Sequence, residues 1–280
     1  MHGVVQNGAY KCMKKKEQMN TILEISGSAA GSAAGAAVGA VIGNAVAGPA
    51  GAIGGAVTGN IVESVFSWVR NEISNRLLSK QEEKRITNVM DLAKKKIESN
   101  FADNKKLRDD NFFDQVNDRS TAEEILEGTL LVAQKEYEER KLPYIANLYA
   151  NIAFDKNISR EMADTLIKIS SDLTYRQLMI LSVVGFSQIT GIKGKEENYK
   201  EVRGLNNVSI ASEIFDLYRK SLIFSSEAIL DAGGINPSKL ILGGYGALVY
   251  NLMELPKFPL PDSCMIDILK FLGIVKLGNF

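Results

Sequence analysis

The side chains that could bond to a substrate or hold a metal ion are few and far apart in this sequence. His2 is the only histidine, and the two cysteines are Cys12 and Cys264. A histidine-activated nucleophile needs a histidine beside the serine or cysteine, and zinc sites need His and Cys ligands in clusters. The glycine-rich residues 243–246 lack both the P-loop lysine and the spacing of a dinucleotide-binding loop. We therefore expect no enzymatic activity, no bound cofactor and no metal site.

The glycine spacing indicates a different chemistry, the close packing of one helix backbone on another. No charged residue occurs between Glu24 and Glu63, and glycine recurs there at every fourth position. Residues four apart share one face of an α-helix, so each run of glycines forms a bare groove. In water each interior glycine costs about 1 kcal/mol relative to alanine, so the groove makes sense where another backbone fills it. The glycines of this repeat are Gly27, Gly31, Gly35, Gly39 and Gly43, followed by Gly51, Gly55 and Gly59.

Pro49 divides the uncharged segment, and its two halves are predicted to form a helical hairpin over residues 25–70. Each helix has roughly 18 to 22 residues and is about 30 Å long, the thickness of a hydrocarbon core. Most apolar positions are alanine, so we expect bilayer insertion only when several copies share their glycine faces. Glu63, Trp68 and Arg70 would then set the depth of insertion, because charges and tryptophan favour the interface.

The sequence after the hairpin has the apolar periodicity and the cap signals of a helical bundle. Residues 79–101 place apolar side chains in helical spacing. Ser120 and Glu123 predict a capping box, after which a helix is expected to run to about Leu142. Pro143 is expected to start the next helix. Further caps are predicted at Ser159 and Thr174.

The C-terminal third changes character and predicts short strands among the helices. Its order is a helix at 210–220, apolar runs at 222–224 and 240–242, and a helix at 247–254 that opens on glycines. This order over residues 175–255 resembles the end of a winged-helix domain. The first of these helices carries Arg219 and Lys220, which are balanced by Glu213 and Asp216. We therefore expect no nucleic-acid binding and favour a protein-interaction role.

Composition sets the remaining expectations. The 280 residues carry a formal net charge of zero, so no global basic field attracts nucleic acid. Two distant cysteines fit a reducing compartment and cannot build a disulfide framework. The expected fold is mainly α, an N-terminal glycine-zipper helical hairpin followed by a helical bundle and a winged-helix-like C-terminal subdomain. The expected segments are a flexible basic arm over 1–24, the hairpin over 25–70, a helical domain over 71–172 and a helical, winged-helix-like domain over 173–280.

The glycine segment GSAAGSAAGAAVGAVIGNAVAGPAGAIGGAVTG resembles the hydrophobic hairpins of bacteriocins, colicin-like toxins and glycine-zipper membrane proteins. The stretch EYEERKLPYIANLYANIAFD resembles bacterial proteins that join a membrane segment to a helical domain. These resemblances imply an intracellular membrane-acting effector, such as an anti-phage abortive-infection protein. In such a protein the helical body would hold back the pore helices until a trigger releases them.

We therefore expect a cytoplasmic, self-associating, pore-forming or membrane-disrupting protein that acts on the inner membrane. Its partners would be the lipid bilayer, further copies of itself, and an activating or inhibitory protein. Two alternatives stay open. One is an oligomeric scaffold whose hairpin associates without lipid, and the other is a winged-helix regulator tethered by its N-terminus.

Overall fold

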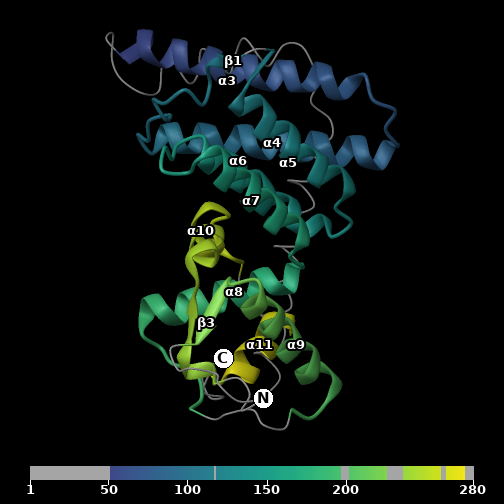
Figure 1. Cartoon of the computed structure of the whole chain (residues 1–280), viewed down its shortest axis with the longest axis vertical. Coiled ribbons are helices and arrows are strands. Elements are labelled where there is room, and N and C mark those ends of the chain that lie inside the picture. Colours follow the sequence, from purple (N-terminus) through teal and green to yellow (C-terminus); the bar gives the residue numbers. More distant parts are fainter. Residues whose placement is uncertain (1–50, 117, 197–201, 226–235, 260–262, 275–280) are drawn as a thin grey trace, which may run out of the picture. The chain divides into compact units, whose positions relative to one another are not determined.

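The computed structural model describes residues 51–116, 118–196, 202–225, 236–259 and 263–274, with side chains from residue 59 onward (Figure 1). In these residues the protein is mainly helical, as predicted, and its strands form two antiparallel pairs. The predicted N-terminal arm and the first helix of the hairpin lie outside the described residues. The contacts divide the chain into two units, Met1–Ser67 and Trp68–Phe280.

Helix α3 (Gly51–Ser74) lies in the part of the chain where the second helix of the hairpin was predicted. The helix continues without a break across the boundary between the two units. In its C-terminal two thirds the buried positions recur every three or four residues, which is the pattern of an amphipathic helix. These positions are Gly59, Val62, Val65, Phe66, Val69 and Ile73.

Helices α4 (Lys80–Ala102) and α5 (Thr121–Lys135) both begin with a capping box. Ser79 and Glu82 form the first, which was not predicted. Ser120 and Glu123 form the second, which was predicted. The prediction that the helix after Ser120 runs to about Leu142 was wrong, because α5 ends at Lys135. The chain turns there so that the buried carboxylate of Glu136 accepts from the backbone N–H of Glu138. A short 3₁₀ helix, Glu139–Lys141, follows.

Helices α6 (Leu142–Ile152) and α7 (Arg160–Asp172) complete this helical bundle. Pro143 lies in the first turn of α6, and the Ser159 side chain caps α7, as predicted. Helix α4 packs on both α5 and α6, and α7 packs on α5 (Figure 1). Helix α6 contributes most of its residues to the core of the bundle. The buried set is Leu142, Tyr144, Ile145, Ala146, Leu148, Tyr149, Ala150 and Ile152.

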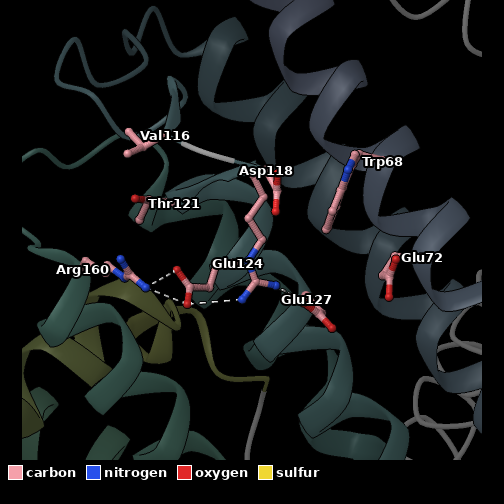
Figure 2. A pocket seen from close by; sticks show the side chains of 9 residues that line it. Trp68, Glu72, Val116, Asp118, Thr121, Glu124, Glu127 and Arg160 are labelled. Atoms are coloured by element: carbon pink, nitrogen blue, oxygen red, sulfur yellow. Dashed lines mark hydrogen bonds and ion pairs between the residues drawn. The ribbon is translucent and has the colours of Figure 1, made fainter.

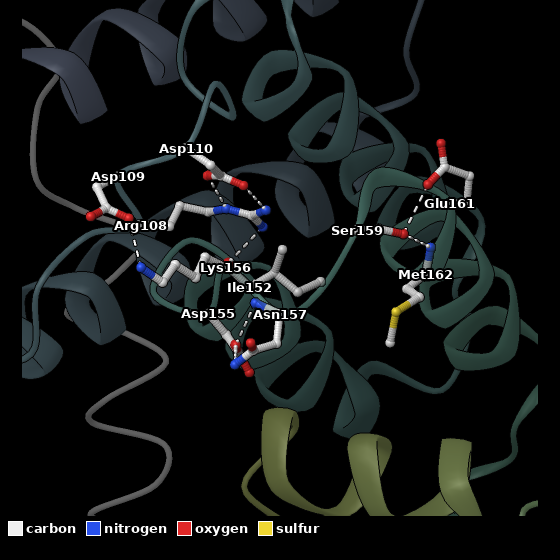
Figure 3. Close-up of polar contacts among 10 residues, drawn as sticks. All are labelled: Arg108, Asp109, Asp110, Ile152, Asp155, Lys156, Asn157, Ser159, Glu161 and Met162. Atoms are coloured by element: carbon white, nitrogen blue, oxygen red, sulfur yellow. Dashed lines mark hydrogen bonds and ion pairs between the residues drawn. The ribbon is translucent and has the colours of Figure 1, made fainter.

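The connection from α4 to α5 contains a short hairpin of two antiparallel strands, β1 (Gln115–Val116) and β2 (Arg119–Ser120), each two residues long. Figure 3 shows the arginine that holds this connection to the bundle. Arg108 Nε donates to Asp110 Oδ1 over 2.7 Å, and its Nη1 donates to the Ile152 carbonyl oxygen over 3.4 Å. Its guanidinium also stacks over the Phe112 ring at 4.3 Å. Asp109 and Asp110 are therefore occupied in ion pairs, the former with Lys156.

The last described segment follows the predicted order of helix, strand, strand and helix. It comprises α8 (Tyr175–Thr190), α9 (Leu205–Arg219), β3 (Ile223–Ser225), the 3₁₀ turn Pro237–Lys239, β4 (Leu240–Leu242), α10 (Gly244–Leu252), the 3₁₀ turn Leu255–Lys257 and α11 (Ser263–Leu272). Thr174 caps α8 through a capping box, as predicted. Strands β3 and β4 pair antiparallel, with Phe224 opposite Ile241. Helix α9 starts five residues before the predicted Ile210, and α11 was not predicted.

Candidate functional site

A hollow of about 510 Å³ lies between the C-terminal part of α3 and the start of α5 (Figure 2). Its lining combines one aromatic ring, two guanidinium groups and four carboxyl groups. The lining residues are Trp68, Glu72, Val116, Asp118, Arg119, Thr121, Glu124, Glu127 and Arg160. All of them belong to the larger unit, which begins at Trp68.

Helix periodicity places these side chains. Trp68 and Glu72 are four residues apart on α3 and therefore share one face of that helix. Glu124 and Glu127 are three apart on α5, so they also face one way. Arg160 is the first residue of α7, directly after its cap. Three separate stretches of sequence thus meet around one hollow.

An alternating chain of charges runs along the floor of the hollow. Glu127 pairs with Arg76, which follows α3, and with Arg119 Nη1 at 2.6 Å. Arg119 also reaches Glu124 at 3.5 Å, and Glu124 pairs with Arg160 Nη2 at 2.6 Å (Figure 2). Three arginines and two glutamates are therefore linked in one network that ties the end of α3 to α5 and α7.

The network is buried on its acidic side and open on its basic side. The side chains of Glu127 and Glu124 are 13% and 26% exposed, whereas those of Arg119 and Arg160 are 40% and 54% exposed. Each guanidinium has five N–H groups, more than its contacts with these glutamates use. The arginines can therefore still donate hydrogen bonds to a group that enters from solvent.

Two carboxylates of the hollow stand apart from this network. Glu72 and Asp118 are both exposed. In the part of the chain that the structure describes, neither forms a hydrogen bond or an ion pair. The lining therefore offers free acceptors from Glu72 and Asp118 as well as spare donors from the arginines.

The predicted packing residues lie in different environments. Gly27, Gly31, Gly35, Gly39 and Gly43 lie outside the described residues. Gly51, Gly55 and Gly59 belong to α3, and Gly59 is buried. Glu63 is half-buried and accepts a hydrogen bond from Ser67 Oγ over 3.4 Å. Of the predicted residues only Trp68 lines the hollow.

The glycines of α3 and its buried side chains lie on the same face of the helix. A residue advances the helix by about 100°, so positions 51, 55, 59, 62, 66, 69 and 73 fall within a sector of about 80°. The first three are the glycines, and the other four are the buried Val62, Phe66, Val69 and Ile73. One stripe of α3 is therefore bare at its N-terminal end and apolar at its C-terminal end.

Sequence reasoning did not find Arg119, Glu124, Glu127 and Arg160. The capping box at Ser120 and Glu123 places α5 but gives no sign that the next carboxylates pair with distant arginines. Their spacing is that of an ordinary exposed helix face, so no local pattern distinguishes them.

The glycine-rich residues 243–246 serve packing against the chain that leads into β3. A Cβ atom at Gly243 would overlap the carbonyl oxygen of Ser221, and one at Gly246 would overlap that of Leu222. The backbone N–H of Gly243 donates to the Leu222 carbonyl oxygen over 2.8 Å. These glycines therefore allow two backbones to approach closely.

The acidic residues of α9 are occupied by contacts within the protein. Glu213 pairs with Arg176 of α8 at 2.8 Å. Asp216 pairs with Lys220 at 2.6 Å and with Arg219 at 3.3 Å. Arg219 and Lys220, the cations considered for nucleic-acid binding, are therefore balanced within their own helix, as the sequence indicated.

The residues that the structure describes contain no group of three or more His, Cys, Asp or Glu side chains placed to hold a metal ion. Among the helices that are described, none combines the length and the apolar character needed to cross a bilayer. Comparison of the chain with protein-family models, with curated proteins and with solved structures finds no match.

Proposed function

We propose that the protein is a self-associating membrane effector that forms pores in, or disrupts, the inner (cytoplasmic) membrane. The glycine faces of residues 27–59 would pack on copies of themselves, and the helical body from Ser79 onward would hold them in check. The proposal assigns no reaction, cofactor or metal to the chain. The abortive-infection setting comes only from the resemblance of the glycine segment to toxin hairpins.

The continuous stripe on α3 is the observation that carries this proposal. Helices that associate closely in a bilayer do so through faces of small residues. On α3 such a face, Gly51, Gly55 and Gly59, continues directly into a buried apolar face that ends at Ile73. The glycine face and the apolar face therefore lie on one helix.

The membrane step is tested by dye release from anionic vesicles with the full chain. The double variant Gly35→Leu and Gly39→Leu fills the groove with two large side chains, so we expect at least tenfold less leakage, a loss of about 1.4 kcal/mol in association or more. Ala33→Leu with Ala37→Leu is the matched control, because it adds the same side chains at the same spacing on another face. Equal leakage from both double variants would exclude the glycine-face model.

The alternative is an oligomeric scaffold that needs no lipid, which agrees with Gly59 and Val62 of α3 being covered by protein in this chain. It predicts that full-length protein sediments as an oligomer without vesicles and causes no leakage. It also predicts that the Gly35→Leu and Gly39→Leu variant sediments as a smaller species. A full-length protein that sediments as a monomer without vesicles and releases dye from them would exclude the scaffold and support the membrane effector.

A further inference from the structure

The hollow between α3 and α5 has the features of a ligand site for a small molecule that carries both charges. Figure 2 shows Trp68 and Glu72 on the α3 side and Asp118, Thr121, Glu124 and Arg160 across from them. Its volume of about 510 Å³ lies in the usual range for small-molecule sites. In this lining the arginines, Glu124 and Glu127 are paired with one another, whereas Glu72 and Asp118 are not.

The arginines form the anion-binding side. Arg119 uses Nη1 and Nη2 for its two glutamates, and Arg160 uses Nη2 for Glu124. Because both guanidinium groups have further N–H donors and are about half exposed, they can take a phosphate without leaving Glu124 or Glu127. A phosphate would suit this side better than a carboxylate, since its oxygens can reach both guanidinium groups.

Two carboxylates, Glu72 on the α3 side of the hollow and Asp118 across from it, can accept a cation. Neither has a partner in the described part of the chain, so each can accept a hydrogen bond from an ammonium group. Trp68 lies one helical turn before Glu72, and an indole face attracts a cation within about 6 Å of its centre. A primary ammonium fits between these groups, because it donates hydrogen bonds to carboxylates as well as facing the ring.

We propose that this hollow binds a phosphoethanolamine group, with its phosphate toward Arg119 and Arg160 and its ammonium toward Glu72 and Asp118. The group is the headgroup of a membrane phospholipid and also occurs in water-soluble glycerophosphoethanolamine. The lipid source rests on the proposed membrane function, and the site itself does not. Tryptophan and arginine side chains both favour the headgroup region of a bilayer, because each has an apolar part and a polar part.

Trp68 is the only tryptophan of the chain, so its fluorescence reports on this hollow without a label. The full chain is titrated with glycerophosphoethanolamine, with glycerol 3-phosphate and with ethanolamine. We expect a saturable change in emission with the first compound at a concentration at least about tenfold lower than with either fragment, since only it satisfies both sides. No saturable change, or equal midpoints for all three compounds, would overturn the proposal.

Two variants and two matched controls test the assignment of the charges. Arg160→Gln and Asp118→Asn should each raise the midpoint by about tenfold, because each removes one charged hydrogen-bonding group. Lys156→Gln and Asp114→Asn make the same charge changes at exposed positions outside the hollow and should leave the midpoint unchanged. Thermal melting of each variant checks that it is folded. Folded Arg160→Gln and Asp118→Asn proteins with unchanged midpoints would overturn the site.

Vesicle flotation distinguishes the two sources of the group. Stronger binding to phosphatidylethanolamine vesicles than to phosphatidylcholine vesicles, reduced in Asp118→Asn, supports the lipid headgroup. Saturable binding of the soluble compound without this vesicle preference supports the free compound and excludes the lipid. Because the titration needs no membrane, a saturable Trp68 signal would keep the site whatever the outcome of the dye-release test.

Discussion

Lys141 is the most deeply buried cation in the part of the chain that the structure describes, with 2% of its surface exposed. Its Nζ pairs with the carboxylate of Glu136, which is 6% exposed, and donates to the Ser171 carbonyl oxygen over 3.5 Å. The pair joins the end of α5, the start of α6 and the end of α7. Two buried charges are tolerated only while they neutralise each other, so each depends on the other.

Replacing Lys141 with methionine should lower the free energy of unfolding by about 3–5 kcal/mol, because Glu136 would keep a buried charge without a partner. Urea denaturation followed by circular dichroism measures this loss. Adding Glu136→Leu should restore much of the stability. Lys156→Met, in an exposed pair with Asp109, should cost less than about 1 kcal/mol. Equal losses for Lys141→Met and Lys156→Met would contradict the expectation.

Two glycines in the first turn of α10 make a second comparison between single residues. A Cβ at Gly246 would overlap the Leu222 carbonyl oxygen, whereas nothing lies within 4 Å of one at Gly244. Gly246→Ala should therefore lower stability by about 1–3 kcal/mol, since two backbones must move apart. Gly244→Ala should be neutral or stabilising by up to about 1 kcal/mol. Thermal unfolding should give Gly246→Ala a melting temperature below that of the natural chain. The melting temperature of Gly244→Ala should equal or exceed that of the natural chain.

At the scale of elements, α4 carries two half-buried carboxyl groups whose ionisation is less favourable than in the unfolded chain. Burial raises the pKa of Asp91 and of Glu98, and the nearby Lys94 and Lys95 only partly oppose it. Arg70 of α3 also faces Asp91. A carboxyl with a raised folded-state pKa favours folding most at low pH, and this contribution is lost as pH rises through the folded-state value.

The variant Asp91→Asn with Glu98→Gln should therefore be more stable than the natural chain at pH 7. The difference should vanish as pH falls below about 4, where carboxyls are neutral in the unfolded chain too. Denaturation midpoints of the variant and the natural chain, measured between pH 3 and pH 8, give this difference in stability. A gain that stays constant with pH would show that ionisation is not its cause.

Asp110→Asn is the control of opposite sign. The hydrogen bond from Arg108 lowers the pKa of Asp110, so this carboxylate stabilises the fold above the unfolded-state value and loses that effect in acid. Its replacement should reduce stability at pH 7, and the deficit should shrink as pH falls. The two variants should thus diverge from the natural chain in opposite directions at neutral pH.

At the scale of the larger unit, side chains of α4 and α6 satisfy the end of α10. Asn151 Nδ2 donates to the Leu252 carbonyl oxygen over 2.8 Å, and Asn147 Nδ2 donates to that of Met253 over 3.3 Å. Lys96 of α4 pairs with Glu254 at 2.5 Å. The last carbonyls of a helix have no partner within it, so these side chains cap α10 from another part of the bundle.

Asn151→Leu should therefore loosen α10 more than the bundle itself. The change removes the donor to Leu252 and the acceptor for Asn100 Nδ2, which lies 3.0 Å away. Hydrogen–deuterium exchange should rise in α10 and the 3₁₀ turn Leu255–Lys257, with little change in α7. Asn157→Leu is the control, because Asn157 is exposed and bonds only to the neighbouring Asp155. Uniform faster exchange in both variants would speak against this role.

The sequence by itself determined the helical class, most helix starts and the order of elements in the C-terminal third. These features are local: a cap such as Ser120 with Glu123, or Thr174 with Gln177, is complete within four residues. The helix that continues from the glycine repeat was also predicted from local spacing, and α3 lies in that part of the chain. The end of α5 was not predictable, because it depends on the burial of Glu136 against a later lysine.

Only the tertiary structure decided which charges meet. Arg76, Arg119 and Arg160 are separated along the chain by more than thirty residues at each step, yet they share the carboxylates of α5. No periodicity links such positions, since their contact arises only when α3, α5 and α7 pack together. The same packing turns Trp68, a residue predicted from its own sequence neighbours, into one wall of a hollow with charges of both signs.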